Sequence, residues 1–449
     1  MSALGPNAHL PAGIAPFGHV VTGEHEFRGM RTVEHHFTLP LDHARPEVGV
    51  INLFARELSS TEHADPAALP WLLYLQGGPG GASPRPGSLS GWMAEAAKTF
   101  RILLLDQRGT GLSTPANRQT LPLCGDAAAQ SAYLTHFRAD SIVHDAEAIR
   151  ALLGADKWST FGQSYGGFCT LTYLSIAPEA LERCLVTGGL ASLTATVDDV
   201  YRATYARMAE RNAEYFGWYP SDRVVLDRAI GHLRTTAEHL PDGRLLTVGL
   251  VQMLGQFLGG NARIHQLHHV FEQAFVPTPG GERLSDAFLA AVQAQAERAT
   301  HPLYALMHES IYAQGTATDW SAERVLEDFP AFSPDAAAPL LTGEMVYRWY
   351  FENDPALRPL EAVASLVAER DDWGRLYDLA ALAANTVPVA AVVYTHDVYV
   401  DKDLSLATAD AVGNLRVWET ADFHHDGIAD EGSEIFKRLL GLTNERALP

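Results

Sequence analysis

Short apolar runs separated by amphipathic stretches dominate the chain from residue 31 to residue 187. Runs 31–39 and 50–58 partly alternate apolar and polar positions around a turn-forming LDHARPE segment, which predicts an antiparallel pair of strands. Continuously apolar runs, typical of strands buried on both faces of a sheet, follow at 71–75 and 102–105, and further short strands are predicted at 158–161 and 184–187. Residues 1–28 lack this pattern and are predicted to form an irregular lead-in.

Helices are predicted between these strands. One helix is predicted at residues 92–100. A second, amphipathic helix is predicted at residues 141–153, with Asp140 or Ser141 as its N-cap and Gly154 just beyond its end. An apolar helix is also expected directly after the strand at 158–161. Strands that alternate with helices in this way predict a mostly parallel, doubly wound sheet.

The pattern changes at about residue 192 and becomes mostly helical until about residue 385. The helices predicted there span residues 201–216, 222–240, 246–258, 262–275 and 286–298, and VPTPGGERLS at 276–285 is expected to be a connecting loop. Strand patterns return at 387–394 and 415–418, and a last helix is expected at 432–440. We therefore predict a core domain of residues 1–191 and 386–449 and an inserted helical cap of residues 192–385 that covers the carboxyl ends of the strands.

A G-x-S-x-G pattern marks the turn between the predicted strand at 158–161 and the apolar helix. Ser164 stands at its centre and Gly162 and Gly166 flank it. A serine at the tip of such a turn has a strained backbone, and side chains two residues to either side would collide, so glycine is favoured at both positions. The helix that follows points its N-terminus at the reaction centre, which leaves the N–H of Tyr165 free to bind an oxyanion.

A nucleophilic serine needs an imidazole to take its proton and a carboxylate to orient that imidazole. Asp397 follows the strand at 387–394, with Asp401 as a second choice, and either His424 or His425 follows the strand at 415–418. Serine, acid and histidine then come in the chain order of α/β-hydrolases.

A glycine-rich QGGPGG segment follows the strand at 71–75. Glycines at a strand exit allow backbone N–H groups to turn toward a substrate oxygen, and we expect the N–H of Gly78 to be the second oxyanion donor. The turn at 106–113 is not a phosphate-binding loop, because no Gly-Lys-Ser/Thr follows it, and Asp106 and Arg108 are interpreted as structural.

Composition excludes several functional classes. The chain has 33 Lys and Arg against 54 Asp and Glu, a formal net charge of −21, which disfavours nucleic acid and anionic membranes as partners. No apolar run is long enough to span a bilayer, and the N-terminus lacks the basic start and apolar stretch of a secretion signal. Three scattered cysteines are too few for a disulfide framework or a zinc site, so a reducing cytoplasm is expected.

Three motifs together resemble those of the proline iminopeptidases (prolyl aminopeptidases), in particular their larger branch: QGGPG at 76–80, DQRGTGLS at 106–113 and GQSYGG at 162–167. Gln76 departs from the HGGPG of many family members. The resemblance continues in DVYVDKDLSLATA, where it favours Asp397 as the acid, and in FHHDGI, where it favours His425 as the base. It implies an α/β-hydrolase fold and release of N-terminal proline from peptides through an acyl-enzyme, without metal or organic cofactor.

An aminopeptidase must also recognise the free amine of its substrate, and carboxylates on the cap are natural anchors because a water-poor pocket strengthens the attraction. Two apolar and aromatic stretches contain such acids, LMHESIYA with Glu309 and LTGEMVYRWYFE with Glu344 and Glu352. They resemble cap segments whose glutamates bind the substrate amine in proline iminopeptidases, most clearly at Glu309. We therefore expect Glu309 and Glu344 to bind the substrate.

Other interpretations remain open from the sequence. An esterase, or an aminopeptidase for other small residues, would use the same machinery, and a ligand-binding homologue with a vestigial triad would keep the same fold. Dehalogenase or epoxide-hydrolase chemistry would need an aspartate in place of Ser164. His265, His268 and His269 share a predicted helical face, but no second cluster completes a metal site, and the aromatic residues 349–351 are more often core than pocket.

Overall fold

A mixed nine-stranded sheet forms the centre of the computed structural model, which describes residues 17–445. Its strand order is β1-β2-β3-β5-β4-β6-β7-β10-β11. The strands from β1 to β5 pair antiparallel, and those from β5 to β11 pair parallel. The predicted mostly parallel sheet with an antiparallel pair before it is therefore confirmed.

The strands of this sheet are β1 (Gly18–Phe27), β2 (Met30–Pro40), β3 (Val50–Ser60), β4 (Trp71–Leu75), β5 (Arg101–Asp106), β6 (Trp158–Gln163), β7 (Leu181–Thr187), β10 (Val389–Tyr394) and β11 (Leu415–Thr420). A separate hairpin consists of β8 (Phe275–Thr278) and β9 (Gly281–Leu284).

The helices before residue 192 and after residue 385 are α1 (Gly91–Ala96), α2 (Ala127–Leu134), α3 (Ala139–Leu152), α4 (Tyr165–Ile176), α15 (Lys402–Ala411) and α16 (Gly427–Asn444). Those between are α5 (Val197–Trp218), α6 (Pro220–Leu233), α7 (Val248–Gln252), α8 (Asn261–Glu272), α9 (Asp286–Ala296), α10 (Pro302–Met307), α11 (Ser321–Val325), α12 (Trp349–Asn353), α13 (Glu361–Ala368) and α14 (Leu379–Ala383).

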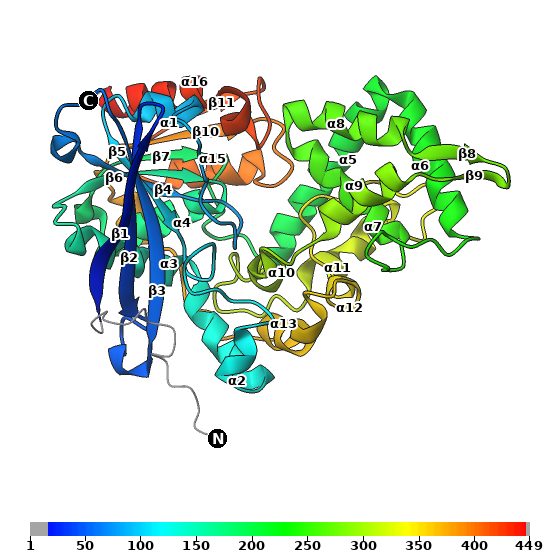
Figure 1. Cartoon of the computed structure of the whole chain (residues 1–449), viewed down its shortest axis with the longest axis horizontal. Helices are drawn as coiled ribbons and strands as arrows, with labels where there is room; N and C mark the ends of the chain where they lie inside the picture. The colour runs from blue at the N-terminus through cyan, green and yellow to red at the C-terminus, as the bar shows by residue number, and fades with distance from the viewer. Residues whose placement is uncertain (1–16, 446–449) are drawn as a thin grey trace.

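Each apolar strand supplies side chains to two cores, one on each face of the sheet. In β4, Leu73 and Leu75 pack into one core, and Leu72 and Tyr74 pack into the other. Helices α1 and α16 cover the second core, whereas α3 and α4 lie on the opposite face of the sheet (Figure 1). This double burial explains why the central strands are continuously apolar.

The segment 192–385 carries α5 to α14 and extends away from the sheet, to the right in Figure 1. Its later part returns to the core, where α13 lies beside α2. Arg138 fixes this contact, because its buried guanidinium donates hydrogen bonds to the carbonyl oxygens of Ala313 and Gly374 at 2.8 and 2.7 Å. We propose residues 192–385 as the cap domain and the remainder as the core domain.

Two stretches predicted as irregular form strands instead. Residues 18–27 of the predicted lead-in are β1, and its first sixteen residues lie outside the part that the structure describes. β1 lies at the sheet edge with mostly exposed side chains, so it has no apolar alternation to reveal it. The predicted loop at 276–285 is the β8–β9 hairpin, in which Thr278 pairs with Gly281 across a two-residue turn.

Several helix boundaries also differ from the sequence predictions. The helix expected at 222–240 ends at Leu233, and the last helix is longer than expected because it begins at Gly427. Arg138 occupies the N-cap position of α3, where Asp140 or Ser141 was expected. Within residues 17–445, no helix has the length and apolar character that crossing a membrane requires.

Candidate active site

Ser164 lies in the turn between β6 and α4, with φ 54° and ψ −122°. The positive φ is unfavourable for a residue with a side chain. Its neighbours have little room: a methyl group on Gly162 would lie 2.4 Å from the carbonyl oxygen of Gly166, and one on Gly166 would lie 1.9 Å from that of Leu75. The physical reason given for both glycines of the motif is therefore confirmed.

Asp397 and His425 are brought together by the loops that follow β10 and β11. Both side chains are buried, and Nδ1 of His425 lies 2.8 Å from Oδ2 of Asp397. The other carboxylate oxygen of Asp397 accepts hydrogen bonds from the backbone N–H groups of Tyr399 and Val400 at 2.9 and 3.0 Å. These bonds fix the carboxylate, which in turn orients the imidazole.

The two second choices have other partners. Asp401 accepts hydrogen bonds from the first N–H groups of α15 and forms an ion pair with Arg207 at 3.1 Å. His424 is hydrogen-bonded through Nδ1 to Asn261 of α8, and burial lowers its pKa to about 3. The geometry therefore favours Asp397 and His425, which the sequence resemblance also favours.

The predicted oxyanion donors lie beside Ser164. A methyl group on Gly77 would lie 3.0 Å from Cβ of Ser164, so the glycine-rich loop after β4 approaches the serine closely. Gly78 has φ 134°, and its N–H makes no hydrogen bond within residues 17–445. The N–H of Tyr165 belongs to the first turn of α4, where helical N–H groups have no intrahelical partner.

A cavity of about 230 Å³, the Ser164 cavity, lies at this turn. Ser164, His425 and Gly78 line it together with Glu344 from the cap. Its other lining residues are Gln76, Gly77, Pro79, Gly81, Gln163, Gln256, Arg263, Arg298, His301, Tyr304, Tyr399 and Asp426. Ser164 and His425 make no direct hydrogen bond in the described chain, a contact that in free enzymes often tightens only when substrate is bound.

The cavity is electrostatically unusual. Burial lowers the pKa of His425, but Asp397 outweighs this with help from Glu344 and Asp426, and the result is a pKa of about 9. Burial raises the pKa of Glu344 to about 7, although the charge of His425 opposes the shift. Two groups with displaced pKa values in one cleft are typical of a catalytic site.

Comparison with known proteins identifies the family. A family model described as alpha/beta hydrolase fold matches residues 70–225. A proline iminopeptidase of Aeromonas sobria is 45% identical over 423 residues, which cover 93% of this chain and 97% of that protein. The chain belongs to the proline iminopeptidase family. A second member, from Aspergillus aculeatus, is 35% identical over 424 residues, which cover 93% of this chain and 94% of its own length. The predicted α/β-hydrolase fold is confirmed.

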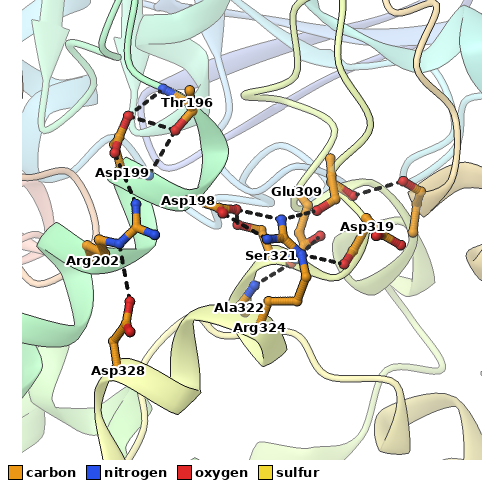
Figure 2. Close-up of polar contacts among 12 residues, drawn as sticks. Thr196, Asp198, Asp199, Arg202, Glu309, Asp319, Ser321, Ala322, Arg324 and Asp328 are labelled. Carbon is orange, nitrogen blue, oxygen red and sulfur yellow. Dashed lines mark hydrogen bonds and ion pairs between the residues drawn. The ribbon is translucent and has the colours of Figure 1, made fainter.

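In this member of the proline iminopeptidase family, Glu309 lies outside the Ser164 cavity. Its two carboxylate oxygens accept hydrogen bonds from the backbone N–H groups of Ser321 and Ala322, at 3.1 and 2.9 Å, at the start of α11 (Figure 2). Glu309 lines a separate cavity of about 20 Å³. Its position therefore does not support the sequence prediction that it binds the substrate amine, whereas Glu344 does line the Ser164 cavity.

The contacts around Glu309 show what its carboxylate does at this position. Asp198 of α5 is bound to Arg324 of α11 by hydrogen bonds of 2.8 and 2.6 Å, and Ser321 also donates to Asp198 (Figure 2). Glu309 adds a third attachment for α11, so the carboxylate holds cap elements together. An acid surrounded by apolar residues looks the same in the sequence whether it faces a backbone or a substrate.

The remaining residues singled out in the sequence have structural partners. Asp106 is paired with Arg85 and accepts from the N–H of Ser83 at 3.0 Å, and Arg108 is paired with Asp145. In the cap, His265, His268 and His269 contact Tyr219, Asp222 and Glu272 respectively. Residues 349–351 do not line the Ser164 cavity. Among the described residues, no group of three or more His, Cys, Asp or Glu side chains is placed to hold a metal ion.

Three charged residues of the cavity were missed in the sequence. Arg263 of α8 forms an ion pair with Asp426 at 2.7 Å, and Arg298 follows α9. Asp426 could have been noticed because it directly follows His425. The two arginines stand in helical patterns without any local motif, and only the folding of the cap brings them to the strand ends.

Proposed function

We propose that the protein is a prolyl aminopeptidase, which hydrolyses the peptide bond after a free N-terminal proline. Family membership supports the substrate class. The observation that carries the chemistry is the buried hydrogen bond from His425, which lines the same cavity as Ser164, to Asp397. The expected partners are therefore peptides with an unblocked proline at the first position.

In this proposal Ser164 is the nucleophile. Its Oγ attacks the prolyl carbonyl carbon while His425 takes the hydroxyl proton, and the N–H groups of Gly78 and Tyr165 donate to the oxyanion. Collapse of the tetrahedral intermediate breaks the C–N bond, and His425 returns the proton to the leaving amine. Water then attacks the prolyl ester with His425 again as base, which releases proline and restores Ser164. Asp397 keeps the imidazole in the required tautomer throughout.

Glu344 is the proposed anchor for the substrate amine. It lines the same cavity as Ser164, and no cationic side chain lies within 4.0 Å of its carboxylate in residues 17–445. A substrate ammonium would supply the missing positive charge in a poorly solvated site. It would also offset the negative field that raises the pKa of His425, so binding of the correct substrate would favour the neutral imidazole that acts as base.

A panel of chromogenic substrates tests the function. Prolyl p-nitroanilide with a free amine should be hydrolysed much faster than the N-acetylated compound or the p-nitroanilides of other small residues. Simple p-nitrophenyl esters serve as a control for general esterase activity. Rapid hydrolysis of the esters combined with no hydrolysis of prolyl p-nitroanilide would contradict the proposal.

Replacing Glu344 with glutamine should lower kcat/KM for prolyl p-nitroanilide by about 1.5–3 kcal/mol, or roughly tenfold to more than a hundredfold, the scale of a hydrogen bond to a charged group. Hydrolysis of a small neutral ester should fall much less, because the ester has no ammonium. The acid limb of the pH profile should also move to lower pH, since loss of this carboxylate lowers the pKa of His425.

Glu309→Gln is the matched control for this experiment, because it removes the other cap carboxylate predicted from the sequence. It should lower the melting temperature and affect the amine and the ester substrate by similar factors. A selective loss of the amine substrate in Glu309→Gln, with none in Glu344→Gln, would restore the original assignment.

Two further expectations belong to this proposal. The chemistry needs no metal or organic cofactor, so chelators should leave the activity unchanged.

Cys124, Cys169 and Cys184 are all free thiols in the structure, and we keep a reducing cytoplasm as the expected location.

A further inference from the structure

Arg298 lines the Ser164 cavity and has unused hydrogen-bond donors. The side chain is almost completely buried, with 3% of its surface exposed, and it follows the C-terminus of α9. Its Nη1 donates to the carbonyl oxygens of Gln295 and Glu297 at 2.7 and 2.9 Å. Nε is shielded from solvent and has no hydrogen-bond partner. Nη2 also makes no hydrogen bond within residues 17–445. Both N–H groups of Nη1 are thus used, whereas Nε and Nη2 make no hydrogen bond in the described chain.

No carboxylate neutralises Arg298 directly. Within the described chain, no Asp or Glu oxygen lies within 4.0 Å of its guanidinium. Asp354 accepts a hydrogen bond from the backbone N–H of Arg298 at 2.9 Å, but its carboxylate lies 3.8 Å from the guanidinium of Arg244. The unpaired Nε–H is costly, because it has lost contact with water and has gained no hydrogen bond.

The other charges of the cavity show what is missing. Arg263 is paired with Asp426, and His425 is paired with Asp397. Among the cavity charges this leaves the carboxylate of Glu344 and the guanidinium of Arg298 without an ion pair within 4.0 Å in the described chain. A ligand that carries one ammonium and one carboxylate would satisfy both groups.

The chemistry of the reaction limits where that carboxylate can be. The carboxyl group of the N-terminal proline is the acyl group transferred to Ser164, so it cannot carry a charge in the substrate. A carboxylate must therefore belong to the leaving group, either as the C-terminus of a dipeptide or as an acidic side chain at the second position. The cavity of about 230 Å³ is smaller than the roughly 300–1,000 Å³ pockets that hold drug-sized ligands, which fits a short occupant.

We propose that Arg298 forms a carboxylate subsite for the leaving group, through its charge and its free Nη2 donors, and that the enzyme thereby favours short or acidic prolyl peptides. This inference rests on the proposed prolyl aminopeptidase function. Because Nε is shielded from solvent, the contact would be made by Nη2, whose N–H groups are charge-assisted donors to a carboxylate.

The test compares initial rates on pairs of substrates that differ in one carboxylate. Pro-Gly is compared with Pro-Gly-amide for the C-terminal source, and Pro-Glu-amide with Pro-Gln-amide for the side-chain source. In the wild-type enzyme, at least one member with the extra carboxylate should have a kcat/KM about tenfold to a hundredfold above its partner without it. Arg298→Gln should bring that ratio close to one, and Arg298→Lys should leave part of it because the charge remains.

The ratio of the two kcat/KM values distinguishes recognition of the carboxylate from a general loss of enzyme stability. Loss of the contacts that Arg298 makes with α9 would affect both members of a pair equally. Arg263→Gln is the matched control: its guanidinium is already paired with Asp426, so it should lower all four rates by a common factor. The pair whose ratio collapses identifies the source of the carboxylate. Ratios near one in the wild type, or ratios unchanged by Arg298→Gln, would overturn the inference.

Failure of this inference differs from failure of the proposed function. If wild-type enzyme hydrolyses prolyl p-nitroanilide and Pro-Gly-amide but ignores the added carboxylates, only the role of Arg298 is wrong. If it hydrolyses neither of these two substrates, which lack a carboxylate, nor Pro-Gly, the aminopeptidase assignment itself is wrong.

Discussion

Replacing Ser164 with alanine should remove nearly all prolyl aminopeptidase activity, with a loss in kcat of about 10⁶-fold, as when the nucleophile of other serine hydrolases is removed. Without Oγ no acyl-enzyme can form, and the remaining binding and oxyanion groups give only a residual acceleration of about 10³–10⁴-fold over water. Turnover of prolyl p-nitroanilide by the purified variant measures the loss.

The fold should survive this substitution. The backbone N–H of Ser164 donates to the carbonyl oxygen of Thr187 at 2.9 Å, and the N–H of Gly167 donates to the carbonyl oxygen of Ser164 at 2.7 Å. Alanine keeps both bonds and experiences the same strain at positive φ. An unchanged circular dichroism spectrum and melting temperature, with loss of labelling by a serine-directed phosphonate, would complete the result. Turnover close to wild type would end the serine-hydrolase hypothesis.

The sequence predicts correctly those parts of the fold in which the local surroundings restrict the type of side chain. Strands β4 and β5 are buried on both faces, so their apolar runs predicted them correctly. The elbow was visible because a strained turn excludes side chains at Gly162 and Gly166. The proximity of Asp397 and His425 was predictable because parallel strands end at one edge, so residues that follow β10 and β11 meet there.

The parts that were missed depend on contacts between distant segments. Strand β1 is stabilised by its pairing with β2. Its side chains are mostly exposed, so their pattern does not indicate this pairing. Glu309 was expected to bind the substrate amine because of its apolar neighbours and the family resemblance, and its carboxylate faces the start of α11 in the structure. Arg298 reaches the cavity only through the path of the cap after α9. A single sequence contains no local signal for any of these pairings.

Replacing His425 with alanine should lower kcat nearly as much as the loss of Ser164, by about 10⁶-fold. Within residues 17–445, His425 is the only histidine whose imidazole hydrogen-bonds to the carboxylate of Asp397. Removal leaves Ser164 without a base and Asp397 as a buried carboxylate without its charged partner. Activity on prolyl p-nitroanilide, measured from pH 6 to pH 10 to cover the raised pKa of about 9, gives the size of the loss.

His424→Ala is the matched control, because it removes the adjacent imidazole and leaves the Asp397 pair intact. His424 is bound to Asn261 of α8, so its loss should weaken the attachment of the cap and lower the melting temperature while reducing kcat only mildly. The aspartates should show the same asymmetry. Asp397→Asn should cost about 10⁴-fold in kcat, since an amide stabilises the wrong imidazole tautomer. Asp401→Asn, which alters only the α15 cap and the pair with Arg207, should cost far less. If the effects of His424 and His425 were reversed, the base would have to be reassigned within the loop after β11.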